Sequence, residues 1–458
     1  MSLLESSDPR PVHFVGIAGA GMSALAELFL RRGVPITGCD ANPAGADDLR
    51  RLGVFVEPHD PAHVDGARAL VVTSAMPKDH PELMRARERG IPVIRRAEAL
   101  GEVTVGRELV AVAGTHGKTT TTVMTATALA AAGRDPTALV GGRVGTWEGN
   151  LLAGSDRLYV VEADEYDRSF LALTPTVAVV TNVEADHLDI YTDLADIKRA
   201  FAQFMRGARS IVLCADDAGA NSLATPSSTE VIRYGATSRD ARLVATSVEA
   251  SAAGSSFDVL YDVDRLGRVQ LAVPGRHNVL NALAAIGSGL ALGADFAAMA
   301  RGLATFTGAE RRFQRLGDAR GVTVVDDYAH HPTEIAATLA AARAAFNGRR
   351  LVAAFQPHLY SRTRDFAKEF GESLAAADAV YLTEIYPARE QPIEGVTATL
   401  VADAIAAAGG RLAWRGERAG LADALAFGVR QGDVVLTIGA GDVTKTGPEL
   451  LQRLRDDA

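Results

Sequence analysis

The chain has 458 residues, a length that suggests roughly three domains of ordinary size. Hydrophobic residues make up 48% of it, enough for large buried cores, and the net charge of −9 argues against nucleic acid as a main partner. The first residues lack the basic and apolar pattern of a leader peptide, and no apolar stretch approaches the length of a membrane span. Its two cysteines, Cys39 and Cys214, lack metal or redox spacing, so we expect both to be buried thiols in a cytoplasmic protein without membrane insertion.

The first hundred residues alternate short apolar runs with helical patterns. Strands are predicted at 11–17, 34–40, 67–74 and 91–96, and helices at 20–33 and 80–90. The apolar runs are continuous, which is typical of parallel strands covered by helices on both faces. We therefore expect a Rossmann-like parallel sheet in a first domain, residues 1–104.

A glycine turn follows the first of these strands. In FVGIAGAGM (14–22), Gly16 and Gly21 fit the outer positions of a dinucleotide-binding fingerprint, Ala18 takes the middle one, and Asp40 is placed to meet a ribose hydroxyl. Three interpretations remain open from these residues: a tight strand–helix turn, a nicotinamide or flavin site, and a site for another nucleotide diphosphate.

A second α/β unit begins near Arg107. Strands are predicted from 107 and at 157–164, 175–182 and 210–217, and a helix at 274–293. Between them, 230–273 has β-type runs separated by turn residues and little helical pattern, which predicts a small antiparallel element. We expect this central domain to span residues 105–307.

The segment AGTHGKTTTT (113–122) lies between a predicted strand and a predicted helix. Its register of Gly114, Gly117, Lys118 and Thr119 is shorter than the full phosphate-loop pattern but keeps its chemistry. Backbone N–H groups at a helix N-terminus attract phosphate oxygens, Lys118 can neutralise the β- and γ-phosphates, and the Thr119 hydroxyl can hold Mg²⁺.

Metal ligands follow two further strands of this domain. EADEYDRSF (162–170) and NVEADHLDIY (182–191) both stand where a predicted strand ends. Ligands bind at that edge of an open parallel sheet, so we expect Lys118, Thr119, Glu162 and His187 to converge there.

The third unit, residues 308–458, is again α/β. Strands are predicted at 321–329, 349–356, 379–385 and 433–439, and a helix at 332–346. The tandem His330 and His331 have no accompanying Cys/His spacing for zinc, so we do not expect a zinc site at this pair. The sequence thus predicts an α/β fold of three domains: an N-terminal Rossmann-like parallel sheet, a central P-loop-type ATP-binding domain with a small antiparallel element, and a C-terminal Rossmann-like domain.

An ordered series of segments resembles the Mur ligase family. It runs from residue 13 to 442 and comprises HFVGIAGAGMSALAE, SAMPKDHPEL, AGTHGKTTTT, EADEYDRSFL, TNVEADHLDIY, GRHNVLNALAAI, GAERRFQRLG, DDYAHHPTEI, FQPHLYSRT, EIYPARE and GAGD. The resemblance implies that the first domain holds a UDP-sugar, that the central domain holds ATP and Mg²⁺, and that the third closes over ATP and receives an amino acid.

Residue roles follow from the same resemblance. UDP-sugar binding is implied for Gly19, Ala20, Gly21, Met22, Ser23, Asp40 and Ser74. ATP binding is implied for Gly114, Thr115, His116, Gly117, Lys118, Thr119, Thr120, Asn278, Asn281, Arg312 and Asp327. Lys118, Glu162 and His187 are the implied catalytic residues, Thr119, Glu162 and His187 the magnesium ligands, and His358 and Arg362 the amino-acid contacts.

The implied reaction is an ATP-dependent ligation through an acyl phosphate. Within the family the segments are most similar to the branch that joins L-alanine to UDP-N-acetylmuramate for peptidoglycan synthesis, and we expect a monomer or weak homodimer. One alternative is the branch that attaches a recycled tripeptide to the same sugar. Others are a nicotinamide oxidoreductase, which leaves GTHGKTT unexplained, and a P-loop switch protein, which leaves the substrate-side segments unexplained.

Overall fold

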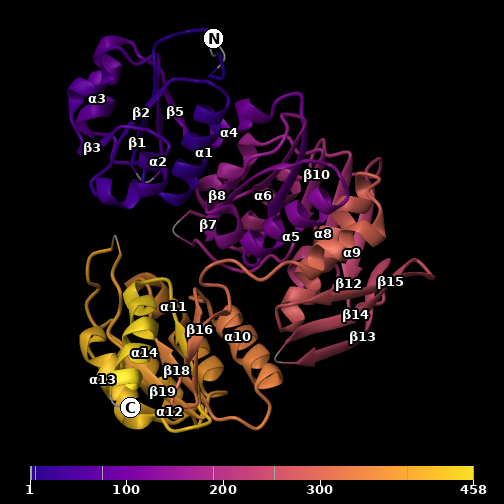
Figure 1. Ribbon diagram of the computed structural model, residues 1–458, viewed down its shortest axis with the longest axis vertical. Coiled ribbons are helices and arrows are strands. Elements are labelled where there is room, and N and C mark those ends of the chain that lie inside the picture. The colour runs from indigo at the N-terminus through magenta and orange to yellow at the C-terminus, as the bar shows by residue number, and fades with distance from the viewer. Residues whose placement is uncertain are drawn as a thin grey trace. The chain divides into compact units, whose positions relative to one another are not determined.

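The computed structural model describes residues 3–5, 7–74, 76–188, 190–251, 253–388 and 390–456. Three β-sheets organise the chain, each flanked by helices (Figure 1). The predicted α/β fold of three domains is confirmed. Ala75, Asp189 and Arg389, which belong to segments quoted above, lie outside the described residues.

The first sheet is entirely parallel. Its order is β3 (Val56–Glu57), β2 (Ile36–Cys39), β1 (Val12–Val15), β4 (Ala69–Val72) and β5 (Val93–Arg95). The helices of this region are α1 (Ala20–Arg31), α2 (Asp47–Arg51), α3 (Pro81–Arg89) and α4 (Arg96–Thr104), with short 3₁₀ turns η1 (Pro43–Ala46) and η2 (Pro61–Val64).

Side chains on β1 alternate between the two faces of this sheet, as the strand period requires. Phe14 meets Phe29 of α1 edge-on, with ring centroids 5.5 Å apart. His13 faces the other side, where its ring lies 5.6 Å from that of His63 in η2. The glycine turn after β1 therefore opens α1 on one face, while the opposite face carries η2 and α3.

The central sheet has ten strands. Their order is β15 (Asp264–Leu271), β14 (Gly254–Tyr261), β13 (Leu243–Ser251), β12 (Glu230–Gly235), β11 (Ser210–Cys214), β10 (Val177–Val180), β6 (Glu108–Ala113), β9 (Leu158–Glu162), β7 (Thr137–Val144) and β8 (Gly149–Leu152). The antiparallel element predicted over 230–273 corresponds to the neighbouring strands β13, β14 and β15, whereas β12, in the same range, pairs parallel with both β11 and β13. The antiparallel pairing of β7 with β8 was not predicted.

The middle of the central sheet is parallel and places the second glycine loop between two neighbours. Strand β6 pairs with β9 on one side and β10 on the other. Its residues Leu109–Ala113 are wholly buried, as expected for a strand covered on both faces. The helices of this region are α5 (Lys118–Ala131), α6 (Leu194–Phe204), α7 (Ala218–Asn221), α8 (Arg276–Ala291) and α9 (Phe296–Ala304), with 3₁₀ segments η3 (Gly145–Trp147) and η4 (Tyr166–Ala172).

The third sheet is parallel except at one edge. Its order is β16 (Gln314–Ala319), β17 (Val322–Asp327), β21 (Val434–Ile438), β18 (Leu351–Phe355), β19 (Ala379–Thr383) and β20 (Leu412–Gly416), and only β16 pairs antiparallel among these described strands. Its helices are α10 (Pro332–Ala345), α11 (Tyr360–Leu374), α12 (Thr399–Ala407), α13 (Arg418–Gly428) and α14 (Thr446–Asp456), with the 3₁₀ turn η5 (Asp442–Lys445).

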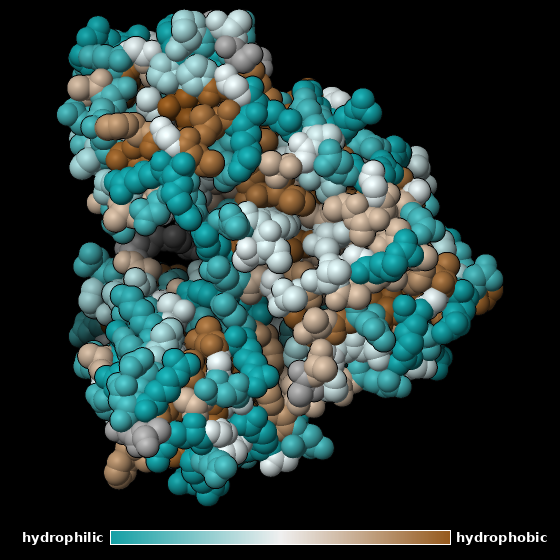
Figure 2. Space-filling model, viewed as in Figure 1, coloured by the Kyte–Doolittle hydropathy of each residue, from teal (hydrophilic) through white to brown (hydrophobic). Residues whose placement is uncertain are grey.

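The chain divides into two compact units. The N-terminal unit comprises Met1–Thr246, Asp258–Val269 and Leu280–Phe306, and the C-terminal unit Ser247–Phe257, Gln270–Val279 and Thr307–Ala458. Among the described residues, no helix is both long and apolar enough to cross a bilayer. Figure 2 shows mainly hydrophilic residues on the face in view, with hydrophobic residues in separate groups.

Candidate active site

The loop between β6 and α5 has two glycines that no other residue can replace without strain. Gly114 has a φ of 141°, and a Cβ there would overlap Thr181 Oγ1 and come within 3.1 Å of two backbone nitrogens. Gly117 caps α5 with a left-handed φ of 81°, and a Cβ there would lie 2.8 Å from Asn281 Oδ1. The loop therefore brings bare backbone to the N-terminus of a 14-residue helix, which is an anion-binding arrangement.

The neighbouring strand β10 holds this loop in shape. The Thr181 hydroxyl donates to the carbonyl of His116 (2.6 Å), and Asn182 Oδ1 accepts from the His116 backbone N–H (2.7 Å). The Thr115 N–H in turn donates to the Asn182 carbonyl (3.1 Å). Sequence reasoning did not single out Thr181 or Asn182, whose position at the end of a strand was their only signal.

Lys118 is turned back onto its own loop and onto a carboxylate. Its Nζ donates to the Gly114 carbonyl (2.6 Å) and lies 2.8 and 3.0 Å from the two oxygens of Glu165. The lysine side chain is only 18% exposed. Burial by itself lowers the pKa of Lys118, but the charges of Glu165 and Asp164 outweigh burial and raise it, so the amine stays protonated.

Glu165 lies beside two of the predicted residues, Lys118 and His187. Burial raises its pKa to about 7 against the opposing attraction of Lys118. His187 Nε2 lies 3.8 Å from Glu165 Oε1, and the Tyr191 hydroxyl donates to the Glu165 carbonyl (2.6 Å). The structure thus brings Lys118 and His187 to one carboxylate that the sequence prediction missed, although three acids at 162, 164 and 165 after one strand were a usable signal.

The two predicted oxygen ligands, Thr119 and Glu162, come from α5 and β9. Thr119, in the first turn of α5, is 7% exposed. Glu162, at the end of β9, accepts a hydrogen bond from the Gly141 N–H through Oε2 (2.8 Å). Asn281 receives a hydrogen bond from the Thr121 hydroxyl (3.1 Å), which places α8 beside the loop.

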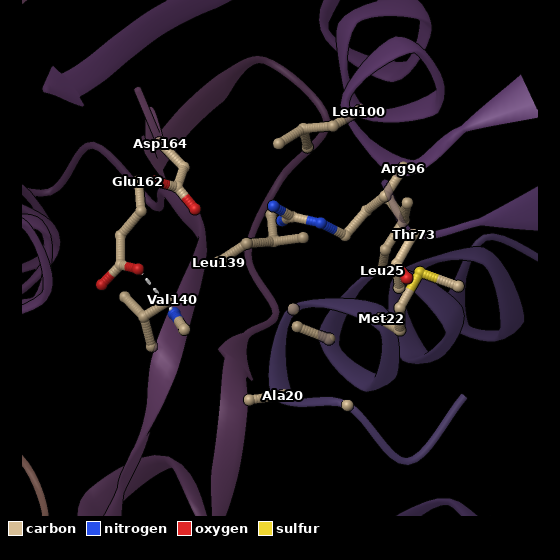
Figure 3. A pocket seen from close by; sticks show the side chains of 14 residues that line it. Ala20, Met22, Leu25, Thr73, Arg96, Leu100, Leu139, Val140, Glu162 and Asp164 are labelled. Atoms are coloured by element: carbon tan, nitrogen blue, oxygen red, sulfur yellow. Dashed lines mark hydrogen bonds between the residues drawn. The ribbon is translucent and has the colours of Figure 1, made fainter. Parts of the chain in front are cut away.

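A cavity lies between the first glycine turn and the end of β9 (Figure 3). Its lining includes Gly19, Ala20, Gly21 and Met22 of the predicted sugar-nucleotide set, together with Thr73, Arg96, Leu139, Glu162 and Asp164. Arg96, from the start of α4, extends into the cavity toward Asp164 and Glu162.

Three other predicted sugar-nucleotide residues are not part of this lining. Asp40 accepts a hydrogen bond from the Ala18 N–H (2.9 Å), so its carboxylate holds the glycine turn. The Ser23 hydroxyl donates to the Ala20 carbonyl (2.9 Å), and Ser74 is exposed beside the lining residue Thr73. Arg96 was missed because only the packing of α4 over Gly21 reveals it.

The C-terminal unit has a set of predicted polar residues of its own. Asp327, at the end of β17, accepts backbone N–H bonds from Phe313 and Ala329 (2.8 Å each). Burial raises the pKa of Asp327 to about 6 against the attraction of Arg312. Arg312 lies over the Tyr328 ring, 5.2 Å from its centroid, and 3.7 Å from Glu334.

The remaining predicted residues of this unit lie near the starts of helices. Asn278, in the first turn of α8, is buried and donates to the Pro274 carbonyl (2.7 Å). The His358 ring stacks on Tyr386 with centroids 5.8 Å apart, and Arg362, in the first turn of α11, is 7% exposed.

Three family models match the chain in succession. They describe the Mur ligase family catalytic domain at residues 11–107, the Mur ligase middle domain at 112–289, and the Mur ligase glutamate ligase domain at 311–441.

Curated proteins and solved structures are similar over nearly the full length. The chain is 48% identical to the UDP-N-acetylmuramate–L-alanine ligase of Acidothermus cellulolyticus, covering 99% of this chain and 98% of that protein. It is 49% identical to the protein of the same name from Kineococcus radiotolerans, covering 97% and 96%. The crystal structure of UDP-N-acetylmuramate–alanine ligase from Thermotoga maritima superposes with a TM-score of 0.83 at 30% identity, covering 98% and 100%. A murein peptide ligase from Psychrobacter arcticus gives a TM-score of 0.71 at 26% identity, covering 97% and 98%.

Proposed function

The chain belongs to the Mur ligase family, and we propose that it joins L-alanine to the lactyl carboxylate of UDP-N-acetylmuramate at the expense of ATP. This is a step of peptidoglycan precursor synthesis. The observation that carries the proposal is the 48% identity to an alanine-adding ligase over 99% of this chain. The tripeptide-adding alternative has the weaker support of 26% identity to a murein peptide ligase.

ATP is assigned to the loop between β6 and α5. The N–H groups at the start of α5 face the side where Lys118 supplies a protonated amine, a pairing suited to the β- and γ-phosphates. In the structure Lys118 is bonded to Glu165, so phosphate oxygens compete with that carboxylate for the amine. We infer that Glu165 holds the amine in place before the nucleotide arrives.

Magnesium fits the donors at this edge. The Thr119 hydroxyl and the Glu162 carboxylate are oxygen ligands of the kind that Mg²⁺ prefers, and they are the proposed ligands. A second ion is assigned to His187, where Glu165, 3.8 Å away, adds a carboxylate. When bound, the metal supplies positive charge that reduces repulsion between the anionic substrates.

The sugar nucleotide is assigned to the cavity that Gly19–Met22 line. The glycine turn and the start of α1 are assigned to its diphosphate, and the opposite end of the cavity, lined by Glu162 and Asp164, to its sugar. The lactyl carboxylate would then lie toward the ATP loop, because Asp164 and Glu162 are close enough to Lys118 for their charges to raise its pKa. One guanidinium in the cavity, Arg96, offsets negative charge there.

The chemistry proceeds in two steps. A lactyl carboxylate oxygen attacks the γ-phosphorus of ATP and ADP leaves, which gives an acyl phosphate. The alanine amine then attacks the acyl carbon, the tetrahedral intermediate expels inorganic phosphate, and the nitrogen loses a proton to solvent. Lys118 stabilises the transferred phosphoryl group, so this chain contributes mainly positioning and charge.

Residues of α8 and of the C-terminal unit are also assigned roles. Asn278 and Asn281, both on α8, are assigned to the adenine, and Arg312 and Asp327 to nucleotide contacts. His358 and Arg362 are assigned to alanine, where the guanidinium of Arg362 is a suitable partner for its carboxylate. A monomer or weak homodimer remains a prediction.

The test is a phosphate-release assay with ATP, Mg²⁺ and UDP-N-acetylmuramate, run with L-alanine, with the tripeptide and with neither. We expect release with alanine only; release with the tripeptide only would assign the recycling reaction instead. Lys118→Ala should abolish turnover while UDP-sugar binding persists. Loss of both together would mean that the sites are wrongly divided between the two glycine loops.

A further inference from the structure

A cluster of metal-binding side chains lies in the first domain, outside the proposed active site. It uses four of the ten histidines of the chain and one of its two cysteines. We call it the histidine cluster, and its members are His13, Cys39, His59, His63, His80 and Glu82. They come from β1, β2, the segment around η2 and the start of α3, so only the fold brings them together.

Glu82 is the centre of the cluster and is 0% exposed. Its Oε2 lies 3.0 Å from Cys39 Sγ and 3.5 Å from His59 Nδ1. Its Oε1 lies 3.5 Å from His63 Nδ1 and 4.0 Å from His13 Nε2. Fully buried carboxylates are rare without a charged partner or a metal. The described side chains around Glu82 are imidazoles and a thiol, which can be neutral, rather than Arg or Lys.

His13 carries the strongest evidence, because one of its ring nitrogens lacks a protein partner. The side chain is 1% exposed, and Nδ1 lies 2.9 Å from the Thr37 hydroxyl. Nε2, aimed at Glu82, has no hydrogen-bond partner among the described residues. A metal-bound histidine has this arrangement: the outer nitrogen is held by a hydrogen bond and the inner one presents its lone pair.

We propose that His13 Nε2, Cys39 Sγ, His63 Nδ1 and a Glu82 oxygen bind a divalent metal ion of the zinc type. Their four ligand atoms all lie within 4.8 Å of one another. Zinc bonds of about 2.0–2.3 Å at tetrahedral angles separate ligand atoms by roughly 3.3–3.8 Å, so small side-chain adjustments close the site. Two imidazoles, a thiolate and a carboxylate are also a ligand set that zinc accepts.

Charge balance favours the ion in this buried place. In the structure the Cys39 thiol donates a hydrogen bond to Glu82 Oε2 (3.0 Å). On binding, the sulfur bonds to the metal and its proton leaves to solvent. The dication then sits with one thiolate and one carboxylate, and the site is electrically neutral.

Outer contacts orient the ligands. The Asp60 N–H donates to Glu82 Oε1 (3.0 Å), and His59 Nδ1 lies 3.1 Å from Cys39 Sγ. The cluster lies on the face of the first sheet opposite α1. Phe14 packs on Phe29 of α1, and its neighbour His13 points to the other face. The ion would therefore be structural, tying β1 and β2 to η2 and α3, and the proposal does not depend on the ligase reaction.

The experiment uses the full-length protein and Co²⁺ or Zn²⁺ as the probe. Metal-free protein is titrated with Co²⁺. A sulfur-to-cobalt charge-transfer band appears only where a thiolate is a ligand, so the proposed magnesium sites, which have no thiolate, do not produce it. Cys39→Ser is compared with Cys214→Ser, the matched control, because Cys214 is also buried but belongs to the central sheet. His63→Gln is the second variant, chosen because this side chain is 20% exposed and its loss is compatible with folding.

We expect one equivalent of Co²⁺ with charge-transfer absorption in the wild type and in Cys214→Ser, at least tenfold weaker binding in His63→Gln, and loss of the band in Cys39→Ser. Zn²⁺ should displace Co²⁺ and raise the melting temperature of the wild type. Absence of the band in the wild type, or a band that survives in Cys39→Ser, overturns the proposal. Equal affinity in His63→Gln and the wild type overturns the assignment of the ligands.

Discussion

Replacing Gly114 by alanine tests whether the shape of the loop before α5 determines ATP affinity. Gly114 has a φ of 141°, where a side chain is strained, and the added methyl overlaps Thr181 Oγ1. Backbone strain of this kind costs about 1–3 kcal/mol. Turning the Thr181 hydroxyl away breaks its bond to the His116 carbonyl and costs about 0.5–1.5 kcal/mol more, since that carbonyl still accepts from Asn182 Nδ2 (3.1 Å).

The strain and the lost hydrogen bond together disfavour the native loop by at least about 1.5 kcal/mol, which corresponds to about tenfold in affinity. We expect Gly114→Ala to weaken Mg²⁺–ATP binding by that factor or more in calorimetric titrations, with UDP-N-acetylmuramate binding unchanged as evidence of folding. Gly133→Ala is the control: its φ is 75°, nothing lies within 4 Å of the added methyl, and it follows the far end of α5. If Gly114→Ala binds ATP within threefold of the wild type, the loop is more plastic than these contacts require and the reasoning fails.

Three further outcomes are expected. Arg96→Met should raise the KM for UDP-N-acetylmuramate at least tenfold, since a charge-assisted hydrogen bond is worth about 1.5–3 kcal/mol, and should leave the ATP dissociation constant unchanged. An equal effect on both ligands would contradict the assignment of the cavity to the sugar nucleotide. The pKa of Asp327 is raised to about 6, so its contribution to folding stability is complete below about pH 4 and is lost as pH rises through 6. Denaturation of the wild type relative to Asp327→Asn should show this decline, and a difference that grows with pH would reverse the sign. Phe170→Ala should lower the free energy of unfolding by about 3–5 kcal/mol, because the Phe170 ring is 1% exposed and stacks on Phe204 with centroids 5.0 Å apart. A loss under 1 kcal/mol in urea titrations would show that other contacts hold η4, the segment after Glu165.

Much of the architecture is accessible from the sequence because parallel strands and amphipathic helices have strong local signals. The strand predicted from 107 and the helix after Gly117 correspond to β6 and α5. The antiparallel element predicted over 230–273 is present as β13–β15, although β12 in that range is parallel. The β7–β8 hairpin was missed because Thr137–Val144 contains two glycines and its partner is only four residues long. Short, glycine-containing strands depend on pairing rather than on propensity.

The candidate site divides in the same way. Lys118 was evident because it belongs to a contiguous motif with a known physical role. Glu165 was not, because only the tertiary structure distinguishes it from Glu162 and Asp164 in the same acidic run. Cys39 was expected to be a buried thiol, and its burial is confirmed, but its partners in the histidine cluster come from other elements, with Glu82 43 positions away in sequence. Clusters assembled across several elements leave no spacing pattern to read.

The order of strands in the central sheet has a consequence for protein synthesis. The motif that contains Lys118 emerges from the ribosome well before β9 and β10, yet β6 lies between those two strands, and Thr181, Asn182 and Glu165 complete its surroundings. A nascent chain that ends near residue 150 thus has the nucleotide motif without its supports. We expect such arrested chains to be unable to retain ATP, and those extended past the end of α6 to acquire this ability, so that nucleotide capture marks a folding event during translation.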